Sequence, residues 1–189
     1  TVELGLIALA MTLLMTAGEF DLSVGSLFGF CPVLMWTLYN TGVTSIEVGF
    51  AISLVAAISI GLVSGLLVTQ LKIPSFLVTL GMLLVVRGTA LFVTSGFPQR
   101  TWKAEDLLLG QILVGNFNIA GLRIYMSLLW FVAAAVLLSY VLTRTRIGNW
   151  IQAAGGDAHA ARARGVDVDL TKVKLFILSA VMAGFAGIV

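Results

Sequence analysis

Charged and polar residues that could do chemistry are few in this 189-residue chain, and the first group of them is the acidic segment 17–26. In it Glu19 and Asp21 stand among glycines, close to Ser23 and Ser26. Asp21 or Ser23 can cap a following helix, because their oxygens can accept hydrogen bonds from backbone N–H groups that lack a partner at a helix start. Acidic residues beside glycines also suit a broken helix that lines a cavity. The segment is therefore a candidate helix cap and a candidate part of a solute pathway.

Arg87 is a second candidate, since it lies inside an otherwise apolar run. A lone guanidinium in hydrocarbon is costly, so its side chain must pair, reach the headgroups or face water. A helix that begins at Pro74 would place Arg87 roughly 20 Å along its axis, near the outer headgroups. Glu3 and Glu47 are candidate partners. An interfacial position and a position beside the solute pathway both stay open.

The third candidate is the basic segment 144–172. Gly155 and Gly156 are expected to interrupt the chain, Asp157 is a good N-cap, and the alanine-rich run up to Arg164 predicts a helix of about two turns. A helix this short has little stability alone, so we interpret it as a surface held for another protein; the alternative is that it merely caps a bundle. The residues assigned to this surface are Gly155, Gly156, Asp157, Ala158, His159, Ala161, Arg162, Arg164 and Gly165.

The elements that position these residues are predicted to be membrane helices. The chain is 59% hydrophobic and only 11% charged, with a mean hydropathy of +1.07. Average soluble domains carry roughly 45–50% apolar and about 25% charged residues. Too few polar groups are available to cover a surface in water, which excludes a soluble enzyme, a nucleic-acid-binding protein and a disordered chain. With one histidine and one cysteine, we expect no catalytic residue, metal site, disulfide or cofactor in this chain.

Apolar runs of about the 20 residues that cross a bilayer recur along the chain. They are continuously apolar, without the alternation that a membrane barrel needs, and they predict an all-α, polytopic transmembrane bundle. We expect one transmembrane domain over 1–189 with about six spans, the outer two incomplete because the chain opens and ends like a piece of a longer protein. The predicted spans are Leu4–Ala17, Leu22–Tyr39, Ile46–Leu71, Pro74–Thr94, Ile124–Thr143 and Val173–Val189.

Small residues four positions apart predict where these helices pack closely. Such residues leave a shallow groove on one helix face and let two backbones approach. The pattern occurs at Gly25 and Gly29, at Ala57, Gly61 and Gly65, and at Ala180 and Gly184.

Basic residues are divided unequally between the two sides of the predicted bundle. One side carries Arg144, Arg146, Arg162, Arg164, Lys172, Lys174 and, by parity, Lys72; the other carries Arg100, Lys103 and Arg123. Because lysine and arginine are retained on the cytoplasmic face, segment 144–172 is predicted to be cytoplasmic and loop 95–122 external. Residues 103–109 of that loop could form one or two amphipathic turns. The loop is either a linker or a docking surface for an external partner.

Three stretches carry a resemblance to the permeases of ribose/xylose/galactose-type ABC sugar importers. Residues 18–26 resemble the Gly-Gly-Ile-Asp-Leu-Ser-Val-Gly-Ser motif of that family. Residues 74–82, followed by Arg87 and a glycine, look like the family's fifth span. Residues 144–165 resemble its cytoplasmic loop, with a Thr-Arg-hydrophobic-Gly start and an Ala-x-Gly-Gly-x-x-x-x-Ala core. The departure is Glu19-Phe20, where glycine and isoleucine are usual, and it adds charge and bulk beside the aspartate.

The resemblance implies a permease of about ten helices in the inner (plasma) membrane of a bacterium. It would work as a homo- or heterodimer, with two ATP-binding subunits at the cytoplasmic face and a solute-binding protein outside. The segment 144–172 would couple it to the ATPases, and Asp21, Ser23, Ser26 and Arg87 would be candidates for the substrate pathway. ATP and Mg²⁺ would belong to the partner, in line with the lack of a G-x-x-x-x-G-K-[ST] loop in this chain.

Other functions need features that are sparse here. Nucleosides, an autoinducer sugar and branched-chain amino acids are alternative solutes for the same kind of permease. An ion-coupled secondary carrier would need acidic or histidine relays within its spans, and the predicted spans between residues 22 and 143 offer none apart from Glu47 at an edge. A membrane enzyme would need clustered histidine, acidic or cysteine side chains at one depth.

Overall fold

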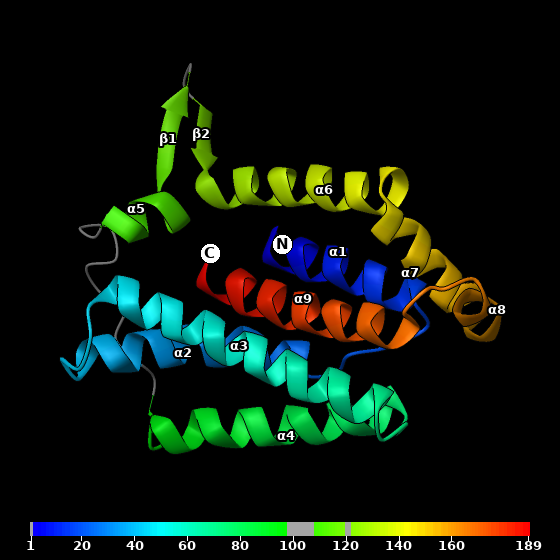
Figure 1. Ribbon diagram of the computed structural model, residues 1–189. Helices are drawn as coiled ribbons and strands as arrows, with labels where there is room; N and C mark the ends of the chain where they lie inside the picture. Colours follow the sequence, from blue (N-terminus) through cyan, green and yellow to red (C-terminus); the bar gives the residue numbers. More distant parts are fainter. Residues whose placement is uncertain (1, 98–107, 120–121) are drawn as a thin grey trace.

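The computed structural model describes residues 2–97, 108–119 and 122–189, and nearly all of them are helical (Figure 1). The helices are α1 (Val2–Thr16), α2 (Val24–Asn40), α3 (Ile46–Thr69), α4 (Ser75–Val93), α5 (Leu108–Val114), α6 (Met126–Arg144), α7 (Arg146–Gly156), α8 (Ala158–Ala163) and α9 (Val168–Ile188). Strands β1 (Asn116–Ile119) and β2 (Leu122–Tyr125) form one antiparallel hairpin. The prediction of an all-α membrane bundle is confirmed.

The long helices run side by side in layers around α9. Helices α1 and α9 lie in the middle, α6 covers one side, and α2, α3 and α4 cover the other (Figure 1). The hairpin and α5 lie at one end of the bundle, and α7 and α8 lie at the opposite end. The long helices therefore connect these two ends of the bundle.

Four helices within the described ranges are long and apolar enough to cross a membrane: α3, α4, α6 and α9. Helix α1 is apolar but shorter, and α2 contains Pro32. The chain is thus a multi-pass membrane protein, and the figure of six spans stays a prediction.

Helix α3 packs closely against α9 through glycine. A Cβ atom on Gly61 would lie 2.7 Å from the Ile177 Cα and from the Phe176 carbonyl oxygen. A Cβ on Gly65 would lie 2.9 Å from the Val173 Cα. Apolar side chains gain little by leaving lipid for protein, so close backbone approach is what holds such helices together. The prediction that small residues mark close helix packing is confirmed for α3.

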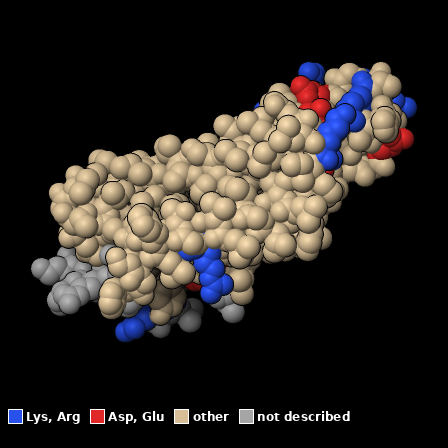
Figure 2. All heavy atoms as spheres, turned by 90° about the horizontal axis from the view of Figure 1, so that it is seen from below, with Lys and Arg blue, Asp and Glu red and all other residues tan. Residues whose placement is uncertain are grey.

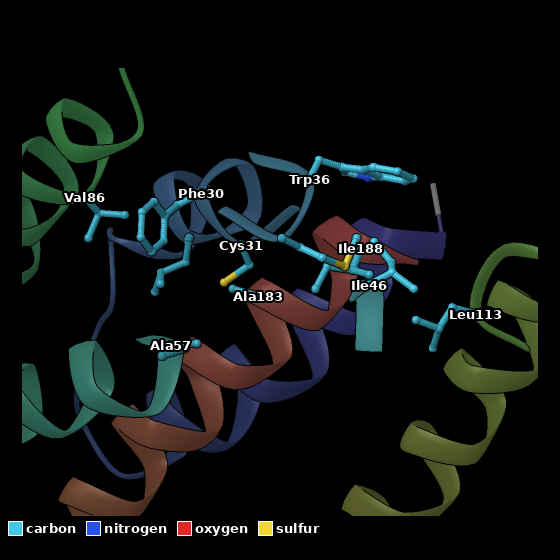
Figure 3. Packing of buried hydrophobic residues seen from close by; sticks show 12 residues of the cluster. Phe30, Cys31, Trp36, Ile46, Ala57, Val86, Leu113, Ala183 and Ile188 are labelled. Carbon is cyan, nitrogen blue, oxygen red and sulfur yellow. The ribbon is translucent and has the colours of Figure 1, made fainter. Parts of the chain in front are cut away.

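Helix α9 packs against α2 in the same way. A side chain on Gly184 would meet the Cys31 Sγ at 2.5 Å, and one on Gly187 would collide with the Phe28 carbonyl. Cys31 is buried and lies beside Ala57 and Ala183 in the apolar cluster between α2, α3 and α9 (Figure 3). The prediction is confirmed for the Ala180–Gly184 pair.

Two predictions about packing and helix limits are wrong. Gly25 and Gly29 are exposed and no atom lies within 4 Å of an added Cβ, so this pair joins no described helices closely. Helix α9 begins at Val168, earlier than predicted, because the Asp167 carboxylate accepts a hydrogen bond from the Leu170 N–H and caps it.

The predicted external loop contains structure that the sequence pattern did not indicate. Part of it folds as α5 and as the hairpin, so α6 begins only at Met126. The Trp130 indole N–H donates to the Ile112 carbonyl at 3.2 Å and ties α5 to α6. The amphipathic turns predicted over 103–109 lie almost wholly outside the described residues.

We expect Gly61→Leu to destabilise the bundle, because the added side chain must displace the α9 backbone. Overpacking of this kind costs about 1–3 kcal/mol, which lowers the melting temperature of a chain of this size by roughly 2–12 °C. The measurement is thermal unfolding of the full-length protein in detergent. Gly81→Leu is the control, since no described atom lies within 4 Å of a Cβ there. Equal melting temperatures for the two variants would contradict the assigned packing.

Candidate functional site: the α7–α8 end and the α1–α2 connection

Helix α8 is capped at both ends, as the sequence predicts. The Asp157 carboxylate Oδ1 accepts hydrogen bonds from the His159 N–H at 2.9 Å and the Ala160 N–H at 3.0 Å. These two bonds, that from Ala160 first, hold the pKa of Asp157 below its ordinary value. The carboxylate therefore stays ionised at neutral pH and fixes the first turn of α8.

Gly165 ends α8 in a left-handed conformation, with φ +84°. The Gly165 N–H donates to the Arg162 carbonyl at 2.9 Å, and the Val166 N–H donates to the Ala161 carbonyl at 3.1 Å. This pair of bonds is the Schellman motif, which needs a residue that tolerates positive φ. The predicted stop at Gly165 is confirmed, with Arg164 as the last half-helical residue.

The two faces of α8 differ in chemistry. Ala161 is buried against Ala154 of α7 and Val168 of α9, which fixes the helix to its neighbours through small apolar contacts. The opposite face is exposed. Its exposed residues are His159, Ala160, Arg162, Ala163 and Arg164. A rigid helix with a free, basic outer face can bind another protein.

Gly155 and Gly156 do not interrupt the chain, in contrast to the prediction. Both lie in α7, whose last residue is Gly156, and the break falls at Asp157. Gly155 has a packing role, because a side chain there would collide with the Thr16 carbonyl at the end of α1. Helix α7 itself was missed by the sequence analysis, although Thr145 caps it by accepting from the Gly148 N–H at 3.3 Å.

Asp21 and Ser23 lie together inside the bundle. The Asp21 Oδ1 accepts from the Ser23 N–H at 2.8 Å and from its hydroxyl at 2.6 Å. The other carboxylate oxygen accepts from the Ser179 hydroxyl of α9 at 3.1 Å. Neither side chain bonds to a backbone N–H of the first turn of α2, so the predicted capping role is wrong. Asp21 instead pins the α1–α2 connection to α9.

Ser26 and Arg87 lie on α2 and α4 and take no part in the hydrogen bonds of Asp21. The Ser26 hydroxyl donates to the Leu83 carbonyl at 2.9 Å and joins the two helices. Arg87 is exposed on α4, and no acidic side chain of the described ranges forms an ion pair with it, Glu3 and Glu47 included. The structure brings Asp21 and Ser23 together, links Ser26 to α4, and leaves Arg87 on an open helix face.

An ion pair that the sequence analysis missed joins the α1–α2 connection to the start of α9. The Glu19 Oε1 accepts from the Lys172 Nζ, and the two side chains are only 12% and 18% exposed. A second pair, Arg162 with Asp169 at 2.7 Å, is half exposed. No local pattern could indicate the first pair, because 153 positions separate its members.

Both ion pairs line a cavity of about 380 Å³ between α8, α9 and the α3–α4 turn. Lys72 and His159 also line it. Acidic and basic side chains gather at the end of the bundle where α7 and α8 lie, and most of the rest of that face is neutral (Figure 2). On this face, the charged groups of the described residues that can contact a water-soluble partner are therefore concentrated at this end.

Comparison with known proteins shows the family of this chain. A family model described as the permease component of the branched-chain amino acid transport system matches residues 1–189. The chain is 34% identical over 99% of its length to the xylose/arabinose import permease protein XylH of Sulfolobus acidocaldarius, covering 51% of that protein. It is 33% identical to the L-arabinose ABC transporter permease protein AraH of Azospirillum brasilense, over 98% of this chain and 52% of that one.

A third relative is the ribose import permease protein RbsC of Escherichia coli strain K12, 31% identical over 97% of this chain and 56% of that protein. The chain thus spans about half the length of these relatives. No solved structure matches it. The family model matches residues 1–189, and the chain has the apolar helices of a membrane protein. The chain therefore belongs to the family described as the permease component of the branched-chain amino acid transport system.

Proposed function

We propose that the chain is part of the membrane permease subunit of an ATP-binding-cassette importer for a monosaccharide of the ribose, xylose or galactose type. The solute passes between helices of two permease copies by alternating access. ATP hydrolysis on separate ATP-binding subunits drives the switch, so this chain is a transport subunit and needs no cofactor of its own. Family membership and the sugar import named for its relatives support the proposal.

The observation that carries the proposal is α8, a short helix capped at both ends and exposed on its outer face. It is joined to α7 and α9 by buried alanine and valine contacts, so a force on α8 directly reaches α9, a helix long and apolar enough to cross the membrane. A two-turn helix is not stable alone, and these caps make it rigid enough to transmit a displacement. We assign it as the contact for the ATPase.

The opposite end of the bundle is assigned to the solute-binding protein. There α5 and the hairpin project beyond α6 (Figure 1), and Asn116, Asn118 and Arg123 are exposed on the hairpin. The excess of basic residues at the α7–α8 end supports a cytoplasmic position for that end and an external position for the hairpin.

The solute pathway is assigned to the side of α2 and α4 on which Ser26 and Arg87 lie. Among the elements that the structure describes, α4 contacts only α2 and α3 closely, and Arg87 is exposed on it. A charge in a membrane helix faces water or a partner, which suits a pathway completed by other helices. Asp21 and Ser23 serve this pathway by positioning the start of α2.

Another small solute is the second candidate, and the family description itself names branched-chain amino acids. Nucleosides and autoinducer sugars belong to the same class of alternatives. An ion-coupled secondary carrier is a more distant alternative, which differs in needing no ATPase.

Cysteine labelling in intact cells tests the orientation. We expect Asn118→Cys on the hairpin to react with a membrane-impermeant maleimide, and Ala160→Cys on α8 to react only after the cells are permeabilised. The protein without an introduced cysteine is the control, because Cys31 is buried and gives little background labelling. Labelling of Ala160→Cys from outside would place α8 beyond the reach of an ATPase.

Charge reversal on α8 tests the coupling. We expect Arg164→Glu to lower ATP-dependent uptake at least tenfold with normal insertion, because the exposed guanidinium faces the partner and not this chain. Lys72→Glu is the matched control: it reverses an exposed charge at the same end of the bundle but outside segment 144–172. Normal uptake by Arg164→Glu would show that α8 is not the transmission element.

A panel of solutes tests the cargo. With the complete complex in vesicles, we expect ATP-dependent uptake of at least one of xylose, arabinose, ribose and galactose, and none of leucine or adenosine. Uptake of leucine or adenosine alone would overturn the sugar assignment and leave the architecture intact. Uptake driven by a proton or sodium gradient without ATP would overturn the importer class.

A further inference from the structure

The α1–α2 connection, residues 17–23, contacts several helices of the bundle. Gly18 turns the chain with φ +81° directly beside Gly155 of α7. The Phe20 N–H donates to the Ser75 hydroxyl at the start of α4, at 3.3 Å. Glu19 and Asp21 both bond to α9. The connection is therefore a junction where α1, α2, α4, α7 and α9 meet.

The two bonds to α9 lie on one face of that helix. Lys172 and Ser179 are about two turns apart, so their side chains point the same way and span roughly 10 Å of the axis. One bond alone would let the connection pivot about a single point. Two bonds on the same face fix both its position and its direction relative to α9.

Helices α7 and α9, which flank α8 in the chain, both contact the junction. Helix α7 passes the end of α1 so closely that a side chain on Gly155 would collide with the Thr16 carbonyl. Helix α9 bonds to the side chains of Glu19 and Asp21. A displacement of α8 reaches α7 and α9 through the buried contacts of Ala161, and it then reaches the α1–α2 connection from two sides.

We propose that Glu19 is a positioning residue for transport: its ion pair with Lys172, together with the Asp21–Ser179 bond, makes the α1–α2 connection move with α9. The start of α2, and α4 through Ser75, then follow the displacement of α8. This inference rests on the proposed function and adds to it the route from the ATPase contact to α2 and α4, the helices assigned to the solute pathway.

The placement of Glu19 favours a coupling role over a purely structural one. The pair is nearly buried, so each charge depends on the other, and removal of one leaves the second without compensation. Glycine, which stands at this position in the sugar-permease motif that residues 18–26 resemble, could not form the pair. The Glu19–Lys172 link is thus an addition in this chain to the bond that Asp21 makes.

The test uses the full-length permease reconstituted with its ATPase and solute-binding protein, and it measures solute molecules transported per ATP hydrolysed. We expect Glu19→Gln and Lys172→Gln each to lower this ratio at least about fivefold, the lower end of usual coupling strengths. The exchange Glu19→Lys with Lys172→Glu should restore the ratio to within about twofold. Lys72→Gln is the matched control, because it removes a lysine that lines the same cavity and forms no ion pair with the residues that the structure describes.

A covalent link between positions 19 and 172 shows whether the two positions move together or whether their contact must open during transport. In the variant with Glu19→Cys and Lys172→Cys we expect a low ratio, and a short bifunctional maleimide should raise it again by joining the two positions. Loss of transport on linking would show that the contact opens during the cycle, and it would overturn the inference. Unchanged ratios in both single variants would overturn it as well.

Failure of the proposed function has a different signature. If the unmodified complex takes up no sugar with ATP, the proposed function fails and the inference fails with it. If the unmodified complex transports and only the predicted differences among variants are missing, the inference alone is wrong.

Discussion

The described bundle depends on the close approach of α9 to α3 and α2 at positions where only glycine or a small side chain fits. In a bilayer the lipid tails are as apolar as leucine, so helices gain little by burying apolar surface against each other. Backbone contact at Gly61, Gly65 and Gly187 supplies the packing instead. This fixes α9 at the centre, and the elements attached to α9 take their positions from it.

The two acidic side chains of the α1–α2 connection bond to the same helix. Asp21 accepts three hydrogen bonds, one of them from Ser179 of α9, and the nearly buried Glu19 has Lys172 of α9 as its partner. Polar groups in an apolar interior are costly without such partners, so these bonds oppose any movement of the α1–α2 connection away from α9. The contacts at α8 are of another kind: small apolar side chains inside, and charges in water outside. The result is a rigid path from an exposed helix to a buried junction.

Local signals predicted the long apolar helices and both ends of α8, whereas long-range contacts left no signal in the sequence. The apolar runs, the Asp157 cap and the Gly165 stop each depend on a few neighbouring residues, so they could be recognised directly. The hairpin was missed because the strands are short and stand between turn-forming residues and an apolar helix. The cap expected from Asp21 failed because a tertiary partner, Ser179, competes for the carboxylate. The Glu19–Lys172 pair could not be found without the fold.

An ion pair is a poor way to gain stability in a nearly buried place, since the cost of removing two charges from water offsets much of their attraction. Apolar contacts of similar size would hold Glu19 and Lys172 positions together at least as strongly, but they are not directional and let surfaces slide. A charge-assisted hydrogen bond fixes which atoms meet and at what angle. At a junction that must follow a moving helix without slipping in register, this directionality matters more than net stability. That is the physical reason why a glutamate here indicates transmission of movement and not merely a filled space.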